Sequence, residues 1–170
     1  RVSLGEFYGL APGANVTGRL ASALRRVGFQ HVFDTDFAAD LTIMEEGNEL
    51  VRRIRAGGPL PLITSCCPAW VKYAEHNLPE LLPNISTCRS PQQMMGSVVK
   101  SHLAERWSRR PEEIFLVSIM PCTAKKYEAR RPEMSREGLP DVDAVLTTRE
   151  FSRLLDLFGI DFRSLPESEF

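Results

Sequence analysis

Short apolar segments alternate with longer amphipathic segments along almost all of this 170-residue chain. The short segments, which we expect to be strands, cover residues 2–7, 31–35, 61–65, 113–120 and 142–148, with a shorter extended piece at 85–88. The longer segments, with apolar residues at helical spacing, cover residues 15–28, 37–58, 68–77, 90–107, 123–130 and 149–159. This alternation predicts one α/β domain, a mostly parallel sheet flanked by helices and joined by right-handed crossovers.

The charge balance and hydropathy exclude two classes of partner. Lys and Arg number 21 against 22 Asp and Glu, so the net charge of -1 gives no field that would attract nucleic acid. No run of about 18 apolar residues is present, so we expect no membrane segment. The chain starts with Arg1 and stops at Phe170 in a polar stretch, and we expect more polypeptide on both sides.

Four cysteines, Cys66, Cys67, Cys88 and Cys122, lack the spacing and density of a secreted disulfide scaffold. Two neighbouring residues such as Cys66 and Cys67 cannot form an unstrained disulfide with each other. Cys66 and Cys67 end the expected third strand, and Cys122 ends the strand at 113–120. Because ligands gather beyond the carboxyl ends of parallel strands, we expect these two loops to open onto one site.

Cys67 and Cys122 each stand next to a proline at the expected start of a helix. A helix amino terminus favours the thiolate, which is the metal-binding and nucleophilic form. A zinc site needs four ligands, and the three histidines lie in segments away from these loops, so we do not expect zinc. The sequence also has no C-x-x-C motif, so we do not expect thioredoxin-like redox exchange. An iron-sulfur cluster with further ligands from elsewhere remains, beside the alternative of an α/β binding module whose cysteines are only structural.

Two cysteine motifs and two motifs between the cysteines carry a resemblance to a known family. "TSCCPAW" (64–70) and "MPCTAKKYE" (120–128), together with "FAADLTIMEEGNEL" (37–50) and "STCRSPQQMMG" (86–96), resemble the iron-only (FeFe) hydrogenases in order and separation. The family's third motif, with two further cysteines, is missing from this sequence. The resemblance implies that residues 1–170 are a partial H-cluster catalytic domain, its first lobe, without the second lobe.

The resemblance also implies a cofactor and its ligands. The H-cluster of this family is a 4Fe-4S cubane bridged through a cysteine to a diiron unit that carries CO, cyanide and a dithiolate amine. Cys67 and Cys122 match two of the four cubane ligands, and Cys88 matches none, so we expect it to be a buried structural thiol. Lys125 resembles the lysine that binds a cyanide. Further iron-sulfur clusters are expected in modules outside this chain.

Proton transfer is the second role that the resemblance implies. Cys66 matches the thiol that carries protons to and from the diiron unit, and Glu46, Ser86 and Glu49 match the relay from there to the surface. A spacing of three places both carboxylates on one side of a helix, although acidic residues on a helix usually form a solvated face. The positions that match the lining of the cofactor cavity are Ser65, Pro91, Gln92 and Met120.

The expected activity is the reversible reduction of protons to molecular hydrogen, with a ferredoxin or another redox protein or subunit as electron donor. The isolated fragment is expected to be inactive, and the cytoplasm is the expected compartment, with the periplasm left open. Two alternatives are a Nar-like iron-sulfur assembly protein, which shares the cubane, and a hydrogen-sensing relative without high turnover. Relatives of the assembly type generally lack the cysteine that stands here at Cys66.

Overall fold

The computed structural model describes residues 2–170, which form two compact units. Unit 1 contains the described part of Arg1–Asp34 together with Ile119–Thr123 and Val145–Phe170. Unit 2 contains Thr35–Ser118 and Ala124–Ala144. Because the chain passes between the units several times, neither unit is a continuous stretch of sequence.

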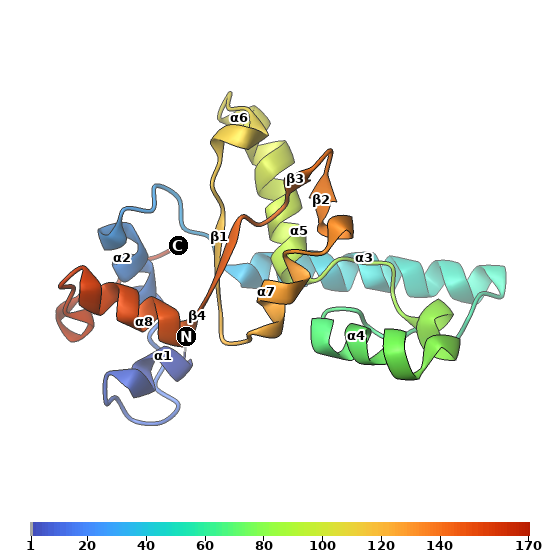
Figure 1. The fold of residues 1–170 in the computed structure, drawn as a ribbon, viewed down its shortest axis with the longest axis horizontal. Helices are drawn as coiled ribbons and strands as arrows, with labels where there is room; N and C mark the ends of the chain where they lie inside the picture. The colour runs from blue at the N-terminus through green and yellow to red at the C-terminus, as the bar shows by residue number, and fades with distance from the viewer. Residues whose placement is uncertain (1) are drawn as a thin grey trace. The chain divides into compact units, whose positions relative to one another are not determined.

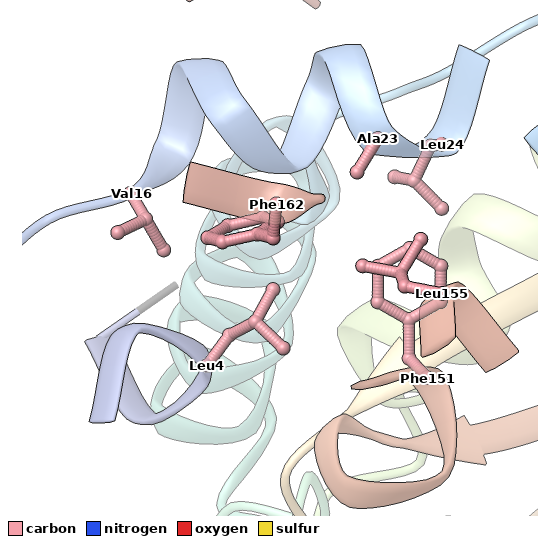
Figure 2. Close-up of a cluster of buried hydrophobic side chains, with 7 residues drawn as sticks. All are labelled: Leu4, Val16, Ala23, Leu24, Phe151, Leu155 and Phe162. Carbon is pink, nitrogen blue, oxygen red and sulfur yellow. The ribbon is translucent and has the colours of Figure 1, made fainter. Parts of the chain in front are cut away.

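Unit 1 is built from short helices around an apolar core. Its helices are α1 (Val2–Phe7), α2 (Thr17–Val27), α8 (Thr148–Leu157) and the 3₁₀ turn η5 (Phe162–Ser164). Figure 2 shows the core side chains, which come from all of these elements and from the loop before α2: Leu4, Val16, Ala23, Leu24, Phe151, Leu155 and Phe162. Phe151 and Phe162 are fully buried, and each is expected to contribute about 3–5 kcal/mol relative to alanine. This core fixes the end of strand β1, since Ile119 packs against it.

Unit 2 contains the longest helix, α3 (Thr35–Ala56), drawn in cyan in Figure 1. Helix α3 packs against α5, and α4 packs against α7 and η1. The other helices and helical turns are α4 (Pro68–Asn77), η1 (Pro79–Asn84), α5 (Pro91–Val98), the π-helical turn η2 (Val99–Leu103), α6 (Ala104–Arg106), η3 (Pro111–Glu113), α7 (Ala124–Glu128) and η4 (Pro132–Met134). Gly96 lets α5 pass close to the backbone at Asp141. A Cβ at position 96 would lie 2.5 Å from the Asp141 carbonyl oxygen.

The strands are short. β1 (Val117–Met120) pairs with β4 (Ala144–Thr147), and both run in the same direction (Figure 1). β2 (Ser135–Arg136) and β3 (Leu139–Pro140) form an antiparallel pair, and one parallel bridge joins Ile63 to Ile85. The predicted α/β class, with helices beside a parallel sheet, is confirmed, although most pairing is limited to a few residues.

Several predicted elements differ from the structure. Residues 2–7 form helix α1 and not a strand, because the helix buries Leu4 in the core of unit 1. Residues 31–34 have no regular secondary structure, and residues 61–65 contain only the bridge at Ile63. The strand predicted at 113–120 is reduced to Val117–Met120, which is half-buried. Short apolar runs do not distinguish strand from helix, and tertiary contacts decided each case.

The helices predicted from periodicity are largely confirmed. α2, α4, α5 and α7 fall within the predicted segments, whereas α3 begins two residues and α8 one residue before the predicted start. α3 continues through Gly47 without a break. Pro68 and Pro91 occupy first-turn positions, where the missing N–H costs nothing. Among residues 2–170, no helix has the length and apolar character that crossing a bilayer requires.

Candidate functional site

The cysteine loop of unit 2 presents two free thiols to solvent. Cys66 and Cys67 are both exposed, and Cys67 is the N-cap residue of α4, with Pro68 in the first helical position. The Cys67 backbone is extended there, and its sulfur stands at the start of a helix as predicted, although the segment before it has only the bridge at Ile63 in place of the predicted strand. Cys67 stands at the amino end of a ten-residue helix, and the thiolate is the form in which a cysteine binds a metal. Cys67 can therefore act as a soft metal ligand.

The second cysteine motif contributes to both units. Met120 is half-buried at the end of β1, and Cys122 is an exposed free thiol two residues later, both in unit 1. Lys125 follows in α7, which belongs to unit 2. The chain thus places an unpaired thiol directly after a strand and before a helix, as the sequence predicted.

A buried carboxylate lies on α3 of unit 2. Glu49 is 5% exposed, and its oxygens accept hydrogen bonds from the Ser86 hydroxyl at 2.8 Å, from Arg53 Nε at 3.0 Å and from the Thr87 amide at 3.1 Å. Burial by itself would raise the pKa of the Glu49 carboxyl, but the bonds from Ser86, Arg53 and Thr87 outweigh burial and lower its pKa. Glu49 is therefore an ionised group shielded from solvent, and not part of a solvated helix face.

Glu46 lies one helical turn earlier and reaches the cysteine loop. Its carboxylate accepts a bond from the Ser65 amide at 3.4 Å, and the Ser65 hydroxyl donates to the Cys88 carbonyl. Glu46 thus contacts the cysteine loop at Ser65, and Glu49 contacts the segment at Ser86 and Thr87. Within residues 2–170, no hydrogen bond joins Glu46 directly to the Ser86 hydroxyl or to the Cys66 thiol.

Lys125 is held against the backbone of the cysteine loop. Its ammonium donates to the Cys66 carbonyl at 2.8 Å and to Glu128 Oε2 at 3.0 Å. The Glu128 carboxylate is 3% exposed and also accepts bonds from the Ser90 hydroxyl at 2.9 Å and from Gln92 Nε2 at 3.3 Å. This network fixes the ammonium beside Cys66, so Lys125 is not the solvated helix lysine that its residue type would suggest.

The remaining predicted cavity residues lie at the start of α5. Pro91 is half-buried at the first helical position, and Gln92 is 2% exposed with its Nε2 also donating to the Lys125 carbonyl at 3.2 Å. Gln92 Oε1 is buried without a hydrogen-bond partner in the described part of the chain, and so are both polar side-chain atoms of Gln93. Buried polar groups are nearly always paired, so these side-chain atoms are available to bind a further group.

Four residues of this region were missed as site residues by sequence reasoning: Arg53, Cys88, Ser90 and Glu128. Cys88 is half-buried, and its thiol donates to Glu49, so the prediction of a purely structural buried thiol is incomplete. Helical spacing could have indicated two ion pairs of this region. Glu49 and Arg53 stand at i, i+4, and Lys125 and Glu128 stand at i, i+3.

The donor set fits an iron-sulfur cluster in part. Cubanes are held by four cysteine thiolates, and the two loops offer free, exposed thiols at helix starts. Across residues 2–170, no three His, Cys, Asp or Glu side chains gather into a metal site. Cys67 and Cys122 are thus fitting soft donors, while a complete ligand shell requires residues from outside this chain.

Comparison with known proteins places the whole chain in one family. A family model described as "Iron only hydrogenase large subunit, C-terminal domain" matches residues 1–170. The NADP-reducing hydrogenase subunit HndD of Solidesulfovibrio fructosivorans is 54% identical over 100% of the chain. The structure of an apo [FeFe]-hydrogenase HydA1 variant from Chlamydomonas reinhardtii superposes with a TM-score of 0.94 at 47% identity over 100% of the chain.

A second class of relative is also similar. The cytosolic iron-sulfur assembly component 3 of Pongo abelii is 42% identical over 99% of the chain. The chain spans 30% of HndD, 36% of the assembly component and 43% of the HydA1 chain. It therefore corresponds to less than half the length of each of these proteins.

Proposed function

Because the chain belongs to the iron-only hydrogenase large-subunit family, in its C-terminal domain, we propose that the full-length protein reversibly reduces protons to molecular hydrogen. Residues 1–170 form the first lobe of the catalytic domain, and the other part of the active site comes from polypeptide outside this chain. The observation that carries the proposal is the buried bond from the Ser86 hydroxyl to Glu49 within reach of the cysteine loop. A binding module has no need of an ionised, desolvated carboxylate beside a free thiol.

Cys67 and Cys122 are the residues that would hold the 4Fe-4S part of the H-cluster. When bound, the H-cluster would pass electrons between the redox partner and the iron at which hydrogen is made or split. Cys67 and Cys122 would hold its cubane as thiolates, the ligand form of cysteine. The two remaining cubane ligands come from the polypeptide outside this chain.

Cys66 supplies the proton at the inner end of the relay. Its thiol is free and exposed in the described chain, and a thiol can both donate and accept a proton. Protons move between Cys66 and the surface by way of Glu46, Ser86 and Glu49. Two contacts support this path: Ser86 donates to Glu49, and Glu46 accepts from the Ser65 amide of the cysteine loop. The lowered pKa keeps the Glu49 carboxylate ionised at neutral pH, so it holds a proton only transiently and releases it to the next group.

The other site residues orient and enclose the cofactor. The Lys125 ammonium, already aimed at the cysteine loop, provides the positive charge that an anionic cyanide ligand needs in a closed pocket. By the family resemblance, Ser65, Pro91, Gln92 and Met120 are the residues that would face the bound cofactor. The orphaned Gln92 Oε1 is a polar atom through which the cavity wall can contact a bound group.

The electron donor is a ferredoxin or another redox protein or subunit, and hydrogen and protons are the substrates. The cytoplasm is the compartment that we propose for the protein. The second candidate function is that of an assembly protein that binds only the cubane. The 42% identity between this chain and cytosolic iron-sulfur assembly component 3 supports this candidate. The Cys66 thiol and the Lys125 ammonium favour the hydrogenase, since a cubane alone needs neither group.

The decisive experiment is anaerobic cluster reconstitution and maturation of the full-length protein. Hydrogen produced from a reduced viologen dye is measured by gas chromatography, and iron-sulfur absorbance is recorded on the same sample. The hydrogenase proposal predicts both signals. Absorbance without hydrogen would favour the assembly candidate or a hydrogen-sensing relative, and no absorbance would leave only the binding module.

A further inference from the structure

We propose that Cys88 is a positioning residue of the proton relay, whose thiol donates a hydrogen bond that aims the Glu49 carboxylate at the Ser86 hydroxyl. This proposal rests on the function given to Glu49 above, but the contact itself belongs to the folded chain. It gives a role to a thiol that has no place among the cluster ligands.

Three successive residues surround Glu49 with donors. The Ser86 hydroxyl donates to Oε2 at 2.8 Å, the Thr87 amide at 3.1 Å and the Cys88 thiol at 3.8 Å, a distance suited to sulfur. On the other side, Arg53 donates to Oε1 from Nε and Nη2. With the thiol in place, Oε2 has donors on several sides, and the carboxylate cannot rotate without breaking one of them.

Cys88 also orients Ser86 through its backbone. The Cys88 amide donates to the Ser86 hydroxyl oxygen at 3.1 Å. Because that oxygen already accepts a bond, its own hydrogen is directed to Glu49 at 2.8 Å. The Cys88 carbonyl accepts from Ser65, whose amide donates to Glu46. Cys88 therefore lies between the two relay carboxylates and contacts the environment of both.

Burial, with the neighbouring carboxylates, raises the pKa of the Cys88 thiol and keeps it protonated. Burial raises the pKa of the Cys88 thiol, and the carboxylates of Glu49, Glu46 and Glu45 raise it further, while the bond with Ser86 acts in the opposite direction. A protonated thiol can donate, whereas a thiolate would repel Glu49. The same environment makes Cys88 a poor nucleophile and a poor metal ligand, unlike the exposed thiols of the cysteine loops.

The other charged groups near Cys88 are engaged elsewhere. Cys88 lines a cavity of about 240 Å³ together with Glu128, Arg131 and Glu133. Glu128 pairs with Lys125, and Arg131 pairs with Glu133 and with α4. From α3, the facing charged groups are those of Glu45, Glu46, Glu49 and Arg53. Of these groups, the Glu49 carboxylate accepts the thiol hydrogen.

The test uses full-length protein with Cys88→Ala, Cys88→Ser and Glu49→Gln. Infrared spectra of the apo protein record the S–H stretching band, and the band lost in Cys88→Ala belongs to Cys88. In Glu49→Gln this band is expected to move to higher wavenumber, because an amide oxygen accepts less strongly than a carboxylate. A band that stays in place would overturn the proposal, whatever the activity of the protein.

Activity provides the second readout. Cys88→Ala should lower hydrogen turnover about two- to fivefold, as expected for loss of one weak hydrogen bond to a charged group. In the plot of turnover against pH, the acid limb of the Cys88→Ala variant should move to higher pH. The reason is that removal of a hydrogen-bond donor raises the pKa of the Glu49 carboxyl. Cys88→Ser retains a donor and should restore both properties. Wild-type turnover and an unshifted profile in Cys88→Ala would refute the positioning role.

The relay itself is tested separately by the turnover of Glu49→Gln. Undiminished turnover in that variant would refute the relay in the proposed function and the positioning role with it. The infrared shift would still decide whether the thiol contact exists, so the two failures are distinguishable.

Discussion

Replacing Ser86 with alanine removes the hydroxyl that connects the Glu49 carboxylate with the Cys88 amide. Ser86 is 6% exposed, donates to Glu49 Oε2 at 2.8 Å and accepts from the Cys88 amide at 3.1 Å. In Ser86→Ala, the carboxylate loses its shortest neutral donor and the Cys88 amide loses its acceptor. Water has little access to replace either bond, so both losses are felt in the folded protein.

The expected cost follows from these two bonds. A hydrogen bond to a charged group contributes about 1.5–3 kcal/mol, and a buried amide left unpaired costs about 1–3 kcal/mol. Some relaxation is expected because Thr87 and Arg53 still bind Glu49, so the free energy of unfolding should fall by about 2–3 kcal/mol. Hydrogen turnover should also fall, since the Ser86 hydroxyl is the proposed step between Glu46 and Glu49.

The pH dependence of Ser86→Ala has a definite sign. The folded-state pKa of Glu49 is lowered, so its contribution to stability is present above the ordinary value of 4.5 and is lost as pH falls through the folded-state pKa. Without the Ser86 bond, the pKa of Glu49 rises. In both proteins this loss sets in as pH falls below 4.5, but in the variant, whose folded-state pKa lies closer to 4.5, the part of the loss that comes from Glu49 should be smaller and should end at a higher pH.

Urea unfolding of the full-length apo protein at several pH values measures the stability, and gas chromatography measures hydrogen. Ser152→Ala is a matched control, because Ser152 is 9% exposed and its hydroxyl donates only to the Arg149 carbonyl of its own helix. The control should lose at most about 1 kcal/mol and keep its turnover. Normal turnover in Ser86→Ala, or an unchanged acid profile, would refute this account of Ser86.

Two further changes test the packing that positions the site. Gly96→Ala would place a Cβ 2.5 Å from the Asp141 carbonyl oxygen, so we expect a loss of about 2–3 kcal/mol and a lower yield of folded protein; a wild-type urea midpoint would contradict this close approach. Arg131→Ala removes the bonds to Glu75 on α4, and because these side chains are partly exposed we expect about 1 kcal/mol of destabilisation. The hydrogen bonds from Arg131 also lower the pKa of Glu75, so this pKa should rise in the variant, as NMR titration can measure.

Motifs were more informative about the site than periodicity was about the strands. The helix starts at Pro68 and Pro91 and the free thiols of the cysteine loops were predictable, because proline and helix-terminus chemistry are local. The strand predicted at 2–7 failed because burial of Leu4 by α2 and α8 is a long-range effect. A six-residue apolar run contains no information about that contact.

The sequence predicted only some of the residues in the buried hydrogen-bond network around Glu49. Glu49 and Ser86 were identified through the family resemblance, whereas Arg53 and Cys88 were not, although both donate to the same carboxylate. The i, i+4 spacing indicates an Arg53–Glu49 pair on many helices, usually at the surface. Its burial depends on the segment 83–88 folding over α3, which no local pattern predicts.

The central claim is that the adjacent thiols of Cys66 and Cys67 have different functions, one in proton transfer and one in cluster binding. Its most direct test compares the matured full-length Cys66→Ala and Cys67→Ala variants by iron content, cubane absorbance and hydrogen evolution. Cys66→Ala should retain the cubane and lose hydrogen evolution, whereas Cys67→Ala should lose iron and cubane absorbance as well. Wild-type turnover in Cys66→Ala, or full cubane content in Cys67→Ala, would contradict the claim.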